Sequence, residues 1–119
     1  MTRSKIDPAV IDDLVDANHI LYQQQVVDGF GHVSARHPEN PHHFLIARSM
    51  APALVTAADI VELDLDGRPV QLNTPGSYLE RFIHSEIYRA RPDVVAVVHS
   101  HSAGLIPFGV VPGAGLKPV

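Results

Sequence analysis

The stretch that decides the fold is Val94-Val95-Ala96-Val97-Val98-His99-Ser100-His101. Its β-branched and small apolar residues predict a buried strand that ends in two histidines separated by one residue. Side chains alternate between the two faces of a strand, so His99 and His101 are expected to point the same way. Two neighbouring imidazoles on a strand suit a metal ion, although ordinary partly buried histidines give the same pattern.

Composition narrows the class of protein. The chain has 119 residues, a usual length for one domain, and 45% hydrophobic residues are enough for a core. The formal net charge of −4 gives no reason to expect a nucleic acid or a membrane as partner. No run of 18 apolar residues and no signal-peptide pattern is present, so we expect a soluble, cytoplasmic protein. The absence of cysteine excludes thiolate ligands, and the eight histidines remain as candidates.

Upstream of the histidine-bearing strand, hydrophobic periodicity predicts a helix and two hairpins. The helix is expected over residues 8–27, with Asp at its N-cap and Pro at its first position. The first hairpin is expected to pair strands 31–36 and 44–47. The second pairs strands 60–65 and 68–70 around an Asp-Gly turn.

A second helix is predicted over residues 78–90, immediately before the histidine-bearing strand. Ser77 and Glu80 match a capping box at its start. A short helix over residues 101–106 is expected after the strand. This order of elements indicates an α/β fold with a mixed, largely antiparallel sheet. The apolar stripe expected on the second helix consists of Leu79, Phe82, Ile83 and Ile87.

Glu80 is the second candidate for chemistry. Its helix and the strand with His99 and His101 are joined by a short connection, so the two can pack as neighbours. A carboxylate facing two imidazoles suits a general acid/base or a further metal ligand. The alternatives are a capping residue and a solvated helix charge. His84 follows on the same helix face and is either a partner of the site or a surface histidine; we interpret it as a surface residue.

Two further pairs are candidates for substrate binding. Gly31 and His32 suit contact with an anion, although a turn glycine with an incidental histidine gives the same pattern. Arg48 and Ser49 fall in a loop, where an arginine fork can clamp a carboxylate or form a surface salt bridge. We interpret the remaining histidines around the proline-rich turn as exposed loop residues; they are His37, His42 and His43.

In order along the chain, residues 31–36, 55–67, 80–84, 91–93 and 97–101 resemble the class II aldolase/adducin family. The most specific part of the resemblance is a glutamate on a helix upstream of His-x-His at a strand end. The resemblance implies a three-layer fold in which helices flank the sheet. It also implies a metal-dependent carbon–carbon lyase that catalyses aldol cleavage or decarboxylation through a metal-stabilised enolate-type intermediate.

Carried over to this sequence, the resemblance implies that His99 and His101 bind a divalent metal, zinc first and manganese second. Glu80 becomes the acid/base residue. The family's third histidine ligand has no counterpart here, so we expect residues 1–119 to be an incomplete, C-terminally truncated domain with weak metal binding and little activity. The family also implies a homo-oligomer, usually a tetramer, that acts on a small molecule. A non-catalytic adducin-like module and an inactive fragment remain the alternatives.

The expected substrate departs from the sugar phosphates of the aldolases. Gly31 and His32 replace a Gly-Asn pair near the substrate anion, and Arg48 and Ser49 replace a Thr-Gly pair. Tyr78 stands where small hydroxyl residues bind phosphate. These residues suit a non-phosphorylated hydroxy-carboxylate, and the sequence is most similar to the decarboxylase-type members of the family.

Overall fold

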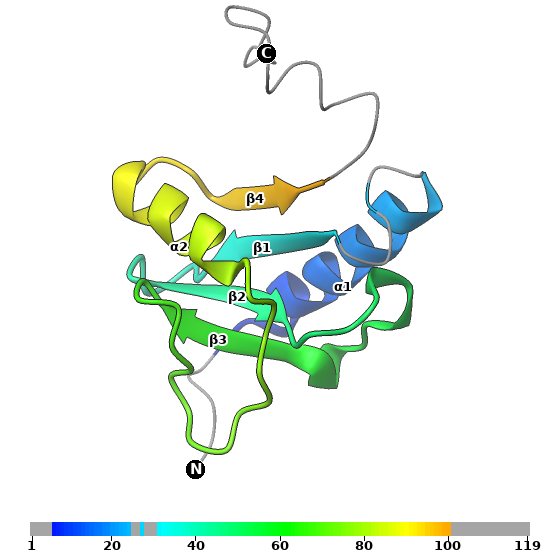
Figure 1. The fold of residues 1–119 in the computed structure, drawn as a ribbon, viewed down its shortest axis with the longest axis horizontal. Helices are drawn as coiled ribbons and strands as arrows, with labels where there is room; N and C mark the ends of the chain where they lie inside the picture. Colours follow the sequence, from blue (N-terminus) through cyan, green and yellow to red (C-terminus); the bar gives the residue numbers. More distant parts are fainter. Residues whose placement is uncertain (1–5, 25–26, 28–30, 101–119) are drawn as a thin grey trace, which may run out of the picture.

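The computed structural model describes residues 6–24, 27 and 31–100, which form a sheet between two helices (Figure 1). The sheet has four strands in the order β3-β2-β1-β4, and every pair of neighbours is antiparallel. Helix α1 lies behind the sheet in Figure 1 and helix α2 lies in front of it. The expected α/β fold with helices flanking a largely antiparallel sheet is confirmed.

Helix α1 (Pro8–Gln23) begins where the sequence predicts. The Asp7 side chain caps it by accepting a hydrogen bond from the Ala9 backbone N–H at 2.9 Å. Leu14 and Asn18 are its buried residues. The helix ends at Gln23, short of the expected residue 27, and residues 25–26 lie outside the described part of the chain. Among the described residues, no helix is long and apolar enough to cross a bilayer.

The first predicted hairpin is confirmed: β1 (His32–Arg36) pairs with β2 (His43–Ala47). β2 also pairs with β3 (Ile60–Asp64), and its Phe44, Leu45 and Ile46 are fully buried. Strand β2 is therefore covered on both faces, and the packed core that the composition predicts is present.

The second predicted hairpin is reduced to one bridge between Leu63 and Pro69. Gly67 turns the chain there with φ of +76°, but Pro69 has no N–H to extend a ladder. Two short 3₁₀ helices precede β3, η1 (Pro52–Leu54) and η2 (Ala57–Asp59). The second is a capped turn, in which the Asp59 carboxylate accepts hydrogen bonds from the Thr56 amide and hydroxyl.

Helix α2 (Arg81–Ala90) corrects two expectations. Glu80 is its N-cap and makes no side-chain capping bond. The Ser77 hydroxyl instead donates to the Ala47 carbonyl at 2.8 Å, so the predicted capping box is wrong. The predicted apolar stripe is also wrong as a buried face, since Leu79 and Phe82 are 87% and 47% exposed. The helix buries the opposite face, with His84, Ser85 and Tyr88, because the part of β1 beneath it carries polar side chains.

Strand β4 (Ala96–His99) pairs with β1 at the edge of the described sheet. It is shorter than the predicted strand and is not buried: Val98 is 44% exposed, and Val95 just before the strand is 72% exposed. The apolar run was therefore a correct signal for a strand and a wrong one for its burial. His101, the expected helix over residues 101–106 and the chain that follows lie outside the described residues.

Candidate metal and acid–base site

The register of β1 against β4 places His32 directly opposite His99. The two imidazole rings are stacked, with centroids 4.8 Å apart and planes at 13°. His32 is 1% exposed, whereas the His99 side chain is 21% exposed. The pair therefore joins a buried histidine to one that solvent can reach.

Glu80 completes this group from the N-terminus of α2. Its Oε2 lies 3.0 Å from Nε2 of His99, and its Oε1 lies 3.8 Å from Nε2 of His32. The Glu80 side chain is 47% exposed. Because the carboxylate contacts a histidine and also faces solvent, it can exchange a proton with a bound molecule.

The donor set of this group fits a divalent metal. One atom each from His32, Glu80 and His99 lies within 4.8 Å of the others. Imidazole nitrogens and a carboxylate oxygen are the ligands that zinc takes at catalytic sites. The expected ligand His99 is thus in place beside Glu80, and His32 lies within reach of the same point. His101 lies outside the described residues.

Behind the group lies a chain of buried polar side chains, which we call the inner relay and which consists of Ser34, His84 and Tyr88. Nε2 of His84 lies 2.6 Å from Nδ1 of His32. Nδ1 of His84 lies 2.6 Å from the Ser34 hydroxyl, which in turn lies 2.7 Å from the Tyr88 hydroxyl. His84 is 0% exposed, so its interpretation as a surface residue is wrong.

Burial governs the ionisation of the inner relay. Desolvation, together with the neighbouring His32 and His99, lowers the pKa of His84 from 6.5 to about 3. Desolvation also raises the pKa of Tyr88 to about 12, although the Ser34 hydrogen bond and the Arg36 guanidinium oppose that rise. The relay is therefore neutral around pH 7, and its hydrogen bonds join uncharged groups.

Tyr78 and Gly31 are the expected substrate residues that border the group. The Tyr78 ring packs on His32 with centroids 4.6 Å apart, and its hydroxyl donates to the Met50 carbonyl at 2.6 Å. Burial raises the pKa of Tyr78. Gly31 precedes His32 and is packed so closely against Val27 that an added Cβ would lie 3.1 Å from the Val27 Cα.

Arg48 and Ser49 lie at the end of β2, one bridge away from the Tyr78 segment. Arg48 pairs with Ser77 in an isolated antiparallel bridge, and the Ser49 amide donates to the Gly76 carbonyl. Nε of Arg48 lies 3.8 Å from the Asp59 carboxylate, and the side chain is 47% exposed. Both alternatives that the sequence left open for Arg48 therefore remain physically available.

Two of the histidines that we interpreted as exposed loop residues are structural. His37 is 3% exposed, and its Nδ1 accepts bonds from the Glu39 and Asn40 amides. His43 belongs to β2, where its Nδ1 lies 2.6 Å from the buried Glu62 carboxylate. The interpretation was correct for His42, which is exposed.

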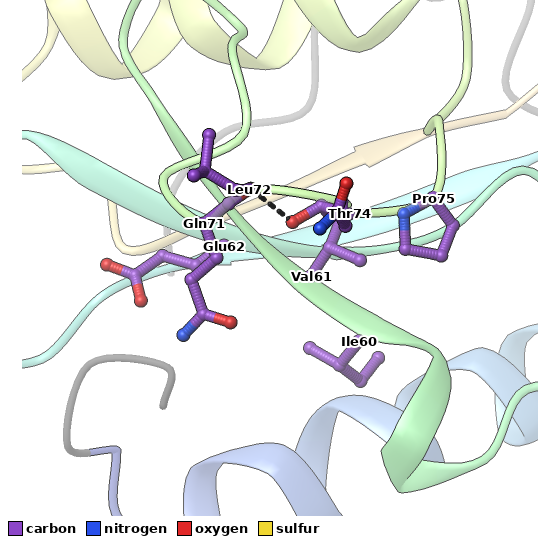
Figure 2. A pocket seen from close by; sticks show the side chains of 8 residues that line it. Ile60, Val61, Glu62, Gln71, Leu72, Thr74 and Pro75 are labelled. Carbon is purple, nitrogen blue, oxygen red and sulfur yellow. Dashed lines mark hydrogen bonds between the residues drawn. The ribbon is translucent and has the colours of Figure 1, made fainter. Parts of the chain in front are cut away.

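A cavity of about 160 Å³ lies between β3 and residues 71–75 (Figure 2). The side chains of Ile60, Glu62 and Gln71 line it, and the Thr74 hydroxyl donates to the Gln71 carbonyl at 2.6 Å. No residue of the His32, Glu80 and His99 group borders this cavity. The chemistry predicted from the sequence therefore lies elsewhere, over β1 and β4.

The sequence reasoning did not find the inner relay, although signals for it exist. Glu80, His84 and Tyr88 recur at intervals of four on one helix face. His32 and Ser34 likewise share one face of β1. The burial of these polar groups depends on the pairing of the helix face with the strand face, which neither pattern specifies alone.

An antiparallel sheet between two helices, with a His–Glu–His group at its edge, defines an α/β domain with a candidate metal-dependent acid–base site. Residues 12–119 match the family model described as "Class II Aldolase and Adducin N-terminal domain". The chain belongs to the class II aldolase and adducin family.

Relatives with stated activities are similar to most of this chain. It is 43% identical over 102 residues to decarboxylase tropJ of Talaromyces stipitatus. The matched region covers 84% of this chain and 38% of tropJ. The chain is 34% identical over 113 residues to the 3,4-dihydroxyphthalate decarboxylase of Arthrobacter keyseri, covering 87% of this chain and 44% of that one. The solved L-fuculose 1-phosphate aldolase of Glaciozyma antarctica superposes with a TM-score of 0.71 at 28% identity, over 91% of this chain and 47% of that one. The chain thus spans less than half the length of each of these proteins.

Proposed function

We propose that the protein is a metal-dependent lyase that removes a carboxylate from a hydroxylated carboxylic acid. The observation that carries this proposal is the half-exposed Glu80 carboxylate 3.0 Å from the His99 imidazole. A scaffold module has no need for an acid/base group beside a metal-ligand histidine, which argues against a purely adducin-like role. The similarity to two decarboxylases supports decarboxylation over aldol cleavage.

His99, together with His101, would hold a divalent metal, zinc or manganese, which when bound supplies Lewis-acid polarisation of a substrate oxygen. Glu80 works beside it, and its Oε2 carries the proton that replaces the lost carboxylate. Glu80 suits this task because it reaches solvent, whereas His32 behind it is buried. Tyr78, whose ring packs against His32 at a tilt of 31°, borders one side of the group.

The proposed substrate class follows from the residues that replace the phosphate-binding residues of the sugar-phosphate aldolases. The Tyr78 ring lies beside His32 at the border of the group, and an aromatic wall suits a planar, hydroxylated aromatic acid. Arg48 and Ser49, together with Gly31, are proposed to recognise its carboxylates. The relative from Arthrobacter keyseri is named for 3,4-dihydroxyphthalate, a molecule of this class, and we propose a related substrate here.

The test is an assay of the protein, expressed from its complete reading frame, with 3,4-dihydroxyphthalate and with L-fuculose 1-phosphate. CO₂ release is measured for the first and aldehyde release for the second, with added Mn²⁺ or Zn²⁺ and with chelator. The proposal expects CO₂ release that chelator abolishes and metal restores. Aldol cleavage without CO₂ release would overturn it.

A further inference from the structure

We propose that the inner relay holds His32 with its proton on Nε2, so that this N–H faces the Glu80 carboxylate and His32 is not a metal ligand. The inference deepens the proposed function, because it takes Glu80 as the acid/base group. His32, which contacts the relay, and the metal-ligand candidate His99 lie side by side but differ in burial.

The donor and acceptor of each hydrogen bond in the inner relay can be assigned from Tyr88 onward. Tyr88 is 1% exposed. Among the described residues, the acceptor within hydrogen-bond distance of its phenol is the Ser34 hydroxyl. The Arg36 guanidinium, 4.7 Å from the ring centroid, strengthens the phenol as a donor. Tyr88 therefore donates to Ser34.

The rest of the direction follows from the inventory of donors and acceptors. The Ser34 hydroxyl accepts a hydrogen bond from the phenol, so it donates its own hydrogen bond to Nδ1 of His84. A neutral imidazole that accepts at one nitrogen carries its proton on the other, so Nε2 of His84 donates to Nδ1 of His32. His32 then carries its proton on Nε2.

The consequence is a division of roles between the two stacked histidines. A metal ligand must offer a lone pair, and the relay leaves Nε2 of His32 with a hydrogen that faces the Glu80 carboxylate. If every hydrogen bond of the relay ran in the opposite direction, Ser34 would donate to Tyr88. The buried phenol would then lose the acceptor for its own hydrogen. His32 therefore presents an N–H group toward the Glu80 carboxylate, 3.8 Å away, and the residues of the inner relay are positioning residues that act through His32.

The test reads the tautomer directly by long-range ¹H–¹⁵N NMR of metal-free, ¹⁵N-histidine-labelled protein, with His32 assigned from His32→Gln. We expect a pyrrole-type Nε2 and a pyridine-type Nδ1 for His32. We expect Ser34→Ala, which removes the donor to His84, to convert this single tautomer into a mixture. Ser85→Ala is the matched control, because Ser85 is equally buried and bonds only the Phe82 carbonyl in the described structure.

A pyridine-type Nε2 in the wild-type protein would overturn the inference, whatever the variants do. So would an unchanged tautomer in Ser34→Ala and in Tyr88→Phe, a second variant that keeps the ring and removes the phenol. The readout needs neither metal nor turnover. A protein with the expected tautomer but without CO₂ release would contradict the proposed function and leave the relay standing.

Discussion

The His32 and His99 rings are stacked across β1 and β4, with centroids 4.8 Å apart. Backbone pairing brings the two residues opposite each other, because they are register partners. Glu80 reaches both from the neighbouring helix terminus. Three residues from three elements thus meet at one point of the sheet edge.

Glu80→Gln removes the proposed acid/base group and keeps its shape. We expect the rate of CO₂ release to fall by about 100-fold or more, the usual contribution of a positioned acid/base group. Stability should change little, because the side chain is 47% exposed and makes no capping bond. Glu86→Gln on the same helix is the control, since its side chain is 70% exposed and lies outside the site. Equal rates for the two variants would refute the role of Glu80.

His84→Ala tests the inner relay as a structural element. The change leaves buried partners on His32 and Ser34 without their hydrogen bonds. We expect the free energy of unfolding to drop by about 2–4 kcal/mol, as for a broken buried network. Urea denaturation at pH 7 measures it, with the exposed His42→Ala expected within about 0.5 kcal/mol of wild type. A loss no larger than that of the control would show that the buried bonds contribute nothing.

Stability should also depend on pH through His84. Its pKa is about 3 in the folded protein against 6.5 as an ordinary histidine. Between these values the unfolded chain binds a proton that the folded chain does not, so this contribution is complete above pH 6.5 and declines as the pH falls toward 3. The expected slope is about 1.4 kcal/mol per pH unit for that one proton. Urea midpoints at several pH values with chelator should show a shallower dependence for His84→Gln, and parallel curves would rule the effect out.

Gly31→Ala tests the close packing in front of His32. A Cβ there would lie 2.8 Å from Cγ1 and 3.1 Å from Cα of Val27, so the chain must shift. We expect a destabilisation of about 1–3 kcal/mol, typical of overpacking, in thermal or urea denaturation. Gly76→Ala is the matched control, because an added Cβ at Gly76 meets nothing within 4 Å. If both variants had the same stability, the contact with Val27 would not restrict position 31.

Much of this architecture could be predicted from local sequence. The capped start of α1, the β1–β2 hairpin and the strand before His99 each have a signal within a few residues. The position of Glu80 beside His99 also followed, because the helix and the strand are adjacent in the chain.

The burial of individual faces could not be predicted in the same way. Phe82 and Ile83 carry the apolar signal of α2, yet the helix buries His84 and Tyr88. That choice depends on His32 and Ser34, which are far away in sequence and offer hydrogen bonds that apolar side chains cannot make. Hydrophobic periodicity depends only on where apolar residues recur, so it does not detect a polar face whose His84 and Tyr88 find their partners in another element.

The most direct test of the account is a calorimetric titration of the metal-free protein with Zn²⁺ and with Mn²⁺, comparing wild type, His99→Ala and the exposed control His42→Ala. The account predicts one divalent ion per chain for wild type and control, and a loss of affinity of about 10-fold or more for His99→Ala. Equal affinity in all three proteins, or no binding by the wild type, would contradict the claim that His99 belongs to a metal site.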